Sequence, residues 1–238
     1  HRMRTVSVLN WPLLYTYRTR LGSYRGLVDF AIRDVLIVTI VASVVFDAQW
    51  WLMLVAYVGH LALYECGYLI NDRSGSAKEH GGSRLKDEIQ PRRFWLLRLI
   101  VLAVCTGVLW HGAGAVVAVE YLALTIAVLL LLIGHTQLAA SGYLRVFSFT
   151  ALALYKYAPP VLPLVAASAS VELLTAVFLC YGMPRVFVYA LRKFGSPTVQ
   201  STVEGAHGTF QIATLLLIAP LVWFSAGDAS VVSFSALQ

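Results

Sequence analysis

Long apolar stretches, each close to the length of a membrane-crossing helix, most constrain what this chain can fold into. A helix of about 20 apolar residues crosses the hydrocarbon core of a bilayer. The sequence predicts seven such spans, at residues 27–47, 49–72, 94–111, 115–133, 142–167, 171–191 and 209–226. The stretches are continuous and do not alternate with a period of two, so the predicted fold class is an all-α membrane protein with about seven transmembrane helices.

Composition and charge support the same class. Of the 238 residues, 59% are hydrophobic and only 13% are charged, which is too apolar for a soluble domain. Lysines and arginines gather before the first span, in the loop at 73–93 and after the sixth span, while the loops after spans one, three and five have none. This alternation predicts a multi-pass protein of a bacterial inner membrane with a cytoplasmic N-terminus. The net charge of +6 then reflects topology, so no nucleic-acid partner is expected.

The N-terminal residues differ from the spans because aromatic and basic side chains alternate there. Trp11, Tyr15 and Tyr24 are interspersed with Arg18 and Arg20. Rings at headgroup depth and arginines against anionic lipid are typical of a helix that lies in the membrane interface. The sequence therefore predicts an interfacial N-terminal segment at 1–26 and a transmembrane helical domain at 27–238, with membrane lipids as partners.

Ionisable side chains inside the spans are the strongest indication of function, because each is costly at bilayer depth unless it has a partner. Glu65, Tyr68 and Asp72 are spaced by three and four residues, so they share one helix face, which is expected to point into the bundle. Arg145 and Lys156 are eleven residues apart, about three helical turns, so one face of the fifth span is expected to carry both.

The sixth span adds further polar groups next to a proline. Arg185 and Tyr189 follow Pro184, which cannot donate a backbone hydrogen bond and often kinks a membrane helix. An acidic stripe that faces basic groups beside tyrosines suits a pocket for an anionic head and an apolar tail. The alternative is a set of structural ion pairs that hold the bundle together. Four other ionisable residues are assigned to local pairing, interfacial positions or helix ends: Asp34, His111, Glu120 and Glu172.

The end of the second span carries the most specific motif. Asn71 and Asp72 are followed by Gly75, and Glu79 and Arg84 lie in the polar loop beyond. The order resembles the first motif of UbiA-type intramembrane prenyltransferases, Asn-Asp-x-x-Asp-x-x-x-Asp followed by Arg, except that Gly and Glu replace the last two aspartates. The resemblance implies a UbiA-like bundle in which Asp72 and Glu79, with Asn71 beside them, hold magnesium that bridges to the diphosphate of a prenyl donor.

The second motif of that family is largely missing. Tyr189 keeps its tyrosine, but Lys193 and Pro197 stand where the family has aspartates. The resemblance therefore implies that one metal site is lost and that basic side chains meet the phosphate directly. The predicted substrate-binding residues are Arg84, Tyr68, Arg145, Lys156, Arg185, Tyr189 and Lys193.

Several functions fit these residues. The first is a UbiA-like transferase that acts on an isoprenoid phosphate or diphosphate in a cavity facing the cytoplasm; a variant transfers a phosphoribosyl-type group to a polyprenyl phosphate. The second is a small membrane terpene cyclase in which Glu65 is a buried acid that protonates an epoxide or alkene. The third is a transporter or flippase of an amphiphilic anion. Transporters often contain internal sequence repeats, and this sequence shows none, so the pattern does not favour this function.

Overall fold

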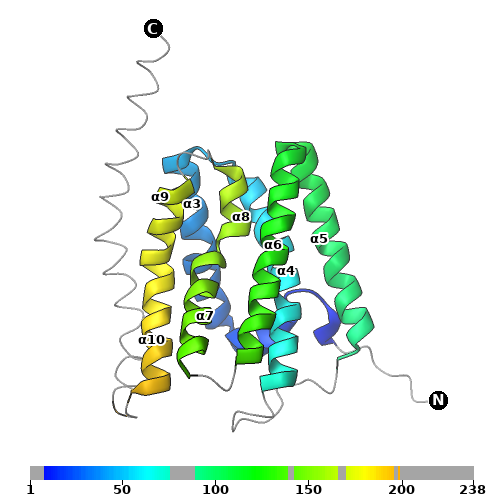
Figure 1. Cartoon of the computed structure of the whole chain (residues 1–238). Coiled ribbons are helices and arrows are strands. Elements are labelled where there is room, and N and C mark those ends of the chain that lie inside the picture. The colour runs from blue at the N-terminus through cyan, green and yellow to red at the C-terminus, as the bar shows by residue number, and fades with distance from the viewer. Residues whose placement is uncertain (1–7, 76–88, 139–141, 166–169, 196–197, 199–238) are drawn as a thin grey trace, which may run out of the picture.

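The chain forms a bundle of helices in the computed structural model, which describes residues 8–75, 89–138, 142–165, 170–195 and 198 (Figure 1). All regular elements of the described residues are helical. The α-helices are α1 (Leu14–Thr16), α2 (Tyr24–Phe30), α3 (Ile37–Phe46), α4 (Trp50–Gly75), α5 (Pro91–Ala113), α6 (Ala115–Gln137), α7 (Gly142–Tyr155), α8 (Ala158–Val161), α9 (Ser170–Val177) and α10 (Met183–Phe194). Short 3-10 or π turns join them: η1 (Val8–Asn10), η2 (Tyr17–Leu21), η3 (Ala31–Leu36), η6 (Leu162–Leu164) and η8 (Phe178–Gly182).

Three helices are long and apolar enough to cross a membrane. They are α4, α5 and α6, whose spanning parts are Trp50–Arg73, Pro91–Ala113 and Ala115–Gln137. They coincide with the second, third and fourth predicted spans to within a few residues. Most of the α4 span is buried inside the bundle, while α5 and α6 expose most of theirs. Because those exposed faces are apolar, the chain has the outer surface of a membrane-inserted protein.

The first predicted span is helical as far as Phe46 and the sixth is helical throughout, but neither is a regular α-helix. The first runs through α2, η3 and α3, with a π turn at its centre. The sixth runs through α9, η8 and α10, again with a π turn just before Pro184. A proline lacks the backbone N–H that would complete the preceding turn, which accounts for the wider turn there.

The fifth predicted span is interrupted, and the seventh lies outside the described residues. Helix α7 ends at Tyr155, and α8 begins only at Ala158, followed directly by Pro159 and Pro160. Two consecutive prolines remove two backbone donors, so the chain changes course here instead of continuing one straight helix. Lys156 lies just past the end of α7, but its backbone N–H still donates to the carbonyl of Leu152 at 2.9 Å, so the helical turn continues to this residue. The expectation that one helix face carries both Lys156 and Arg145 stays a prediction.

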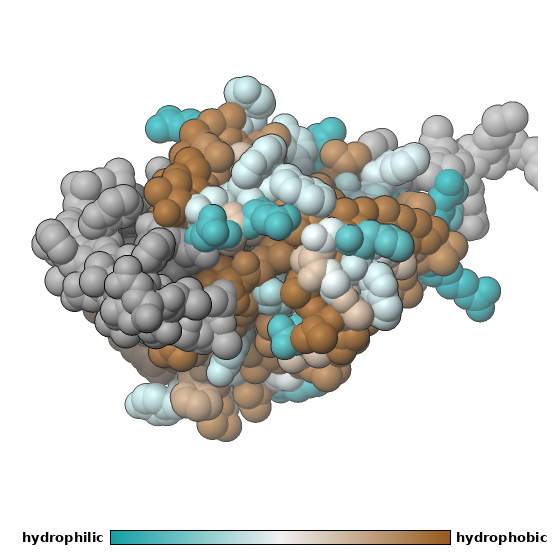
Figure 2. All heavy atoms as spheres, turned by 90° about the horizontal axis from the view of Figure 1, so that it is seen from above, coloured by the Kyte–Doolittle hydropathy of each residue, from teal (hydrophilic) through white to brown (hydrophobic). Residues whose placement is uncertain are grey.

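The long helices run up and down, so their ends gather at two opposite ends of the bundle (Figure 1). The lower end in this view holds the N-terminal residues, the starts of α5 and α7 and the ends of α4, α6 and α10. We call it the basic end, because a group of arginines and a lysine lies at or near the helix ends there: Arg18, Arg20, Arg25, Arg73, Arg92, Arg93 and Lys193. Seen from above, the opposite end presents hydrophilic side chains with hydrophobic atoms around them (Figure 2).

The N-terminal segment, defined here as residues 8–21, packs into the basic end of the bundle. It consists of short turns and reverses at Leu13, which has a left-handed backbone with φ of 69°. Asn10 and Tyr15 are fully buried, while Trp11 and Tyr24 beyond the segment stay exposed. The segment thus differs from the single interfacial helix expected from its composition, because charged side chains of α4 and α5 bind its backbone.

Candidate functional site

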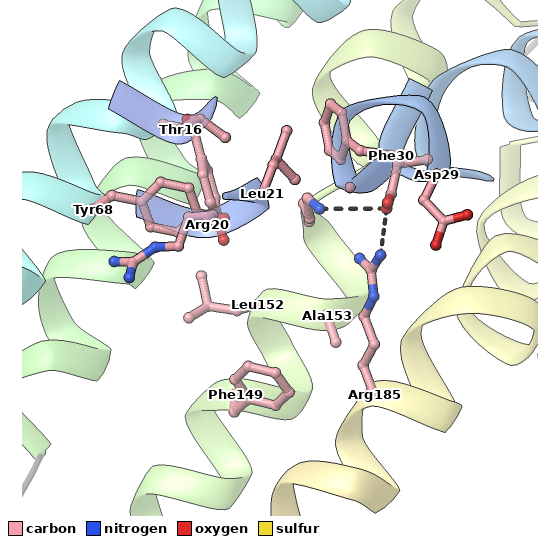
Figure 3. A pocket seen from close by; sticks show the side chains of 14 residues that line it. Thr16, Arg20, Leu21, Asp29, Phe30, Tyr68, Phe149, Leu152, Ala153 and Arg185 are labelled. Carbon is pink, nitrogen blue, oxygen red and sulfur yellow. Dashed lines mark hydrogen bonds and ion pairs between the residues drawn. The ribbon is translucent and has the colours of Figure 1, made fainter. Parts of the chain in front are cut away.

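A cavity of about 420 Å³ lies between the N-terminal segment, α2 with η3, α4, α7 and α10 (Figure 3). Its volume is within the range of small-molecule sites. Three cationic side chains, two carboxylates and four aromatic rings line it: Arg20, Lys156 and Arg185; Asp29 and Asp34; Phe30, Tyr64, Tyr68 and Phe149. Leu21, Leu152 and Ala153 add apolar wall.

Asp34 is the centre of charge on one side of the cavity. Its Oδ1 lies 2.5 Å from Nη2 of Arg185 and 3.5 Å from Nζ of Lys156. The Tyr157 hydroxyl donates to the same oxygen and accepts a hydrogen bond of 2.7 Å from Nη1 of Arg185. Figure 3 shows Arg185 reaching up from α10 to this carboxylate. Two cations share one buried carboxylate, so this group keeps an excess of positive charge.

Arg20 brings a third cation to the cavity from the N-terminal segment. Its Nη2 lies 2.6 Å from Oδ1 of Asp72, and its guanidinium lies 4.5 Å from the ring centroid of Tyr68. The Tyr15 hydroxyl donates to the other oxygen of Asp72 at 2.6 Å. Burial and this hydrogen bond raise the pKa of Tyr15, so the phenol stays a donor at neutral pH. Both carboxylate oxygens of Asp72 are therefore engaged.

Thr16 contributes a polar group that the described residues leave unsatisfied. It lines the cavity and is buried, yet its hydroxyl oxygen makes no hydrogen bond within the described part of the chain. A buried hydroxyl without a partner is unusual and costly. The oxygen itself has almost no accessible surface, so it lies beside the cavity and is not presented to it.

Glu65 and Arg98 form a second buried ion pair, away from the cavity lining. Their side chains are 0% exposed, and Nη2 and Nε of Arg98 lie 2.7 Å and 3.0 Å from Oε2 of Glu65. Glu65 also accepts from the backbone N–H groups of Leu13 and Thr16, at 2.9 Å and 2.7 Å. Arg98 donates to the backbone carbonyls of Asn10 and Trp11. We call this pair the Glu65–Arg98 clamp, because it fixes the N-terminal segment.

This geometry does not favour Glu65 as the acid of a cyclase. All the contacts to its two oxygens that the described residues provide are hydrogen-bond donors. A protonated carboxyl would direct its own O–H against one of these donors. Glu65 is thus suited to a structural role as a carboxylate.

The predicted site residues divide into three groups. Tyr68, Lys156 and Arg185 line the cavity, and their role in binding a substrate stays a prediction. Asp72 and Tyr189 contact residues of the lining: Asp72 binds Arg20, and Tyr189 stacks on Phe149 with ring centroids 4.1 Å apart. Asn71 accepts a hydrogen bond of 3.4 Å from the Thr136 hydroxyl, and Lys193 is exposed beside Tyr189. Arg145 is buried in α7 and does not line the cavity. Glu79 and Arg84 lie outside the described residues.

Three charged residues of the cavity and the clamp escaped prediction from the sequence. Asp34 was assigned to local pairing, yet its partners come from α10 and from the end of α7. Arg98 stands alone in the apolar third span, and that isolation was a signal that it needs a buried partner. Arg20 gave no such signal, because nothing in its neighbourhood distinguishes it from the other arginines before the first span.

The described residues around Asp72 do not fit a magnesium ion. Magnesium needs several oxygen ligands in near-octahedral arrangement, and within the described ranges no three His, Cys, Asp or Glu side chains are grouped to hold a metal. One oxygen of Asp72 already faces the guanidinium of Arg20, which repels a dication. Glu79 lies outside the described residues, so the magnesium site at Asp72 and Glu79 stays a prediction.

Comparison with known proteins gives no assignment. No family model matches the chain, and no curated protein or solved structure matches it either.

Proposed function

We propose that this chain is an integral-membrane transferase of the UbiA-like type that acts on an isoprenoid phosphate or diphosphate. The observation that carries the proposal is a single cavity with three cations and four aromatic rings, next to the Asn71–Asp72 motif. Charged groups serve the anionic head, and the rings and aliphatic side chains serve the isoprenoid tail. The basic end, where the N-terminal segment borders the cavity, is the cytoplasmic side in this proposal.

The head group is bound by Lys156 and Arg185. Both are partly exposed to the cavity and share Asp34, so together they retain positive charge for a phosphate. Asp29 also lines the cavity, but it is exposed at its edge, where water screens its charge. Charge-assisted hydrogen bonds from Arg and Lys to phosphate are short and strong.

The tail is bound along the aromatic wall. Tyr64 and Tyr68 pack edge to face with centroids 4.8 Å apart on α4, and Phe149 faces them from α7. These faces bind an unsaturated chain by dispersion and stabilise positive charge on its first carbon.

In the proposed reaction, a nucleophilic atom of the acceptor forms a bond to the first carbon of the isoprenoid chain while the bond from that carbon to the phosphate oxygen breaks. The electron pair of the broken bond leaves with the phosphate, and the proton of the acceptor passes to water at the exposed edge of the cavity. Lys156 and Arg185 stabilise the charge that develops on the leaving oxygen.

A binding measurement tests the proposal. Protein in lipid nanodiscs is titrated with geranyl diphosphate, and formation of prenylated product is followed by mass spectrometry with lipid and aromatic acceptors. Lys156→Ala and Arg185→Ala should each weaken binding by about tenfold, as expected for loss of a charge-assisted contact. Arg93→Ala, an exposed arginine at the start of α5, is the control and should bind like the wild type.

The results separate the remaining hypotheses. Unchanged affinity in both cavity variants would favour structural ion pairs. Binding without any product, together with release on the other side of a sealed vesicle, would favour the transporter or flippase.

A further inference from the structure

We infer that Arg20 of the N-terminal segment is the resident cation at Asp72, and that the cavity binds its anionic ligand by direct contact with Arg20, Lys156 and Arg185, without a bridging metal ion. This inference rests on the proposed function, because it concerns the same ligand. It assigns to Asp72 the role of holding an arginine instead of a metal.

The first observation is that Asp72 already has partners at both carboxylate oxygens. Both oxygens are engaged, one by the guanidinium of Arg20 and the other by the hydroxyl of Tyr15, each at 2.6 Å. A guanidinium and a dication at the same carboxylate repel each other, so they compete for the position. Tyr15 is fully buried, which fixes its hydroxyl on Asp72.

The second observation is that Arg20 lines the cavity and has N–H donors left for a ligand. Its side chain is 22% exposed and lines the cavity, and the Asp72 contact uses only one of its two terminal nitrogens. A guanidinium has five N–H donors, so others remain for a ligand oxygen. The ring of Tyr68 under the guanidinium keeps it in place.

The third observation is that the Glu65–Arg98 clamp fixes the backbone of the segment that holds Thr16 and Arg20. Thr16 lies one helical turn before Arg20 and lines the same cavity, while its hydroxyl oxygen is fully buried without a hydrogen-bond partner in the described residues. Its backbone N–H is fixed on Glu65 at 2.7 Å. The clamp thus orients a segment that presents the Arg20 guanidinium to the cavity, and a guanidinium supplies the charged donors that a phosphate needs.

The test is a titration of the full chain in nanodiscs with geranyl diphosphate, once with EDTA and once with magnesium. We expect the wild type to bind with affinities within about twofold of each other in the two conditions. Arg20→Ala should weaken binding by about tenfold, since it loses a charge-assisted contact. Arg18→Ala removes an exposed arginine of the same turn and should change affinity by less than about twofold.

Other results would overturn the inference. If EDTA abolishes binding and magnesium restores it, or if Arg20→Ala binds like the wild type, then the cavity uses a metal or does not use Arg20. If Arg20→Ala fails to fold, Arg20→Lys preserves the charge and is titrated instead, and its binding should still not depend on magnesium. A wild type that binds in neither condition defeats the proposed function itself, and the inference with it.

Discussion

Each buried carboxylate of the bundle described here is paired with a basic residue from a distant part of the chain. Glu65 binds Arg98, Asp72 binds Arg20, and Asp34 binds Arg185 and Lys156. A charge taken out of water is costly unless it is paired and hydrogen-bonded. The pairs therefore connect segments that are far apart in sequence, and loss of one partner should cost more than loss of both.

Arg98→Met tests this at the clamp. The variant leaves Glu65 buried without its cation and should lower the free energy of unfolding by about 3–5 kcal/mol. Adding Glu65→Gln should recover part of that loss, because it removes the unpaired buried charge, although the single amide oxygen can accept from only one of the Leu13 and Thr16 N–H groups. Thermal unfolding of the detergent-solubilised variants measures both. A double variant as unstable as Arg98→Met would contradict the assignment.

Asp34→Asn distinguishes a binding site from a structural ion pair. Removing this carboxylate leaves Lys156 and Arg185 without their shared anion, so affinity for geranyl diphosphate should rise, by about tenfold or less, while thermal stability falls. Asp47→Asn, at an exposed helix end on the opposite side, should change neither quantity. Weaker binding in Asp34→Asn would show that the carboxylate supports the ligand and does not compete with it.

At the scale of the elements, close packing of α4 on α5 and α6 holds the centre of the bundle. Gly59 allows the approach, because a Cβ at this position would lie 2.8 Å from Cβ of Cys105 and 2.4 Å from the hydroxyl of Tyr121. That hydroxyl donates to the carbonyl of Ala56 at 3.0 Å. Small residues at helix contacts are typical of membrane bundles, where packing replaces the hydrophobic effect.

Gly59→Ala should therefore destabilise the bundle by about 1–3 kcal/mol through overpacking, even though alanine is the better helix former. Gly107→Ala is the matched control on α5, because no atom lies within 4 Å of its added Cβ, and it should be neutral or slightly stabilising. Unfolding in graded denaturant reports both variants. Equal stability of the two would mean that the α4 contact tolerates a methyl group.

For the whole molecule, the charge distribution and the apolar flanks of the described helices suit insertion in a membrane. Most of the described arginines at helix ends gather at the basic end, and the exposed faces of α5 and α6 are apolar: Leu96, Leu99, Ile100, Val104, Val108, Val116, Val119, Ile126 and Leu130. Such faces are stable in lipid and cause aggregation in water. The cavity, bordered by the N-terminal segment, lies toward the basic end.

Labelling of single cysteines tests the orientation that we propose. In a variant without Cys66, Cys105 and Cys180, an impermeant thiol reagent should label Gln90→Cys only from the cytoplasmic side of sealed vesicles. It should label Gln49→Cys only from the other side, since the two positions are exposed at opposite ends of α4 and its neighbours. Labelling of both from one side would exclude α4 as a membrane-crossing helix.

Hydropathy and charge along the chain were enough to predict the helical class and the positions of α4, α5 and α6. The reason is that a helix in lipid satisfies its backbone hydrogen bonds within itself, so its apolar residues must be consecutive and can be counted. Helix periodicity also predicted that Glu65 and Asp72 face inward, and both are buried. Local rules determine these features.

The partners of the buried charges were decided only by the tertiary structure. Arg98 reaches Glu65 and Arg185 reaches Asp34 across 33 and 151 positions of sequence, and no local pattern encodes such a separation. The N-terminal segment likewise has the composition of a surface helix, yet the Glu65–Arg98 clamp binds its backbone and draws it into the bundle. An ionisable group at bilayer depth must find a partner, but which partner it finds depends on how the helices pack.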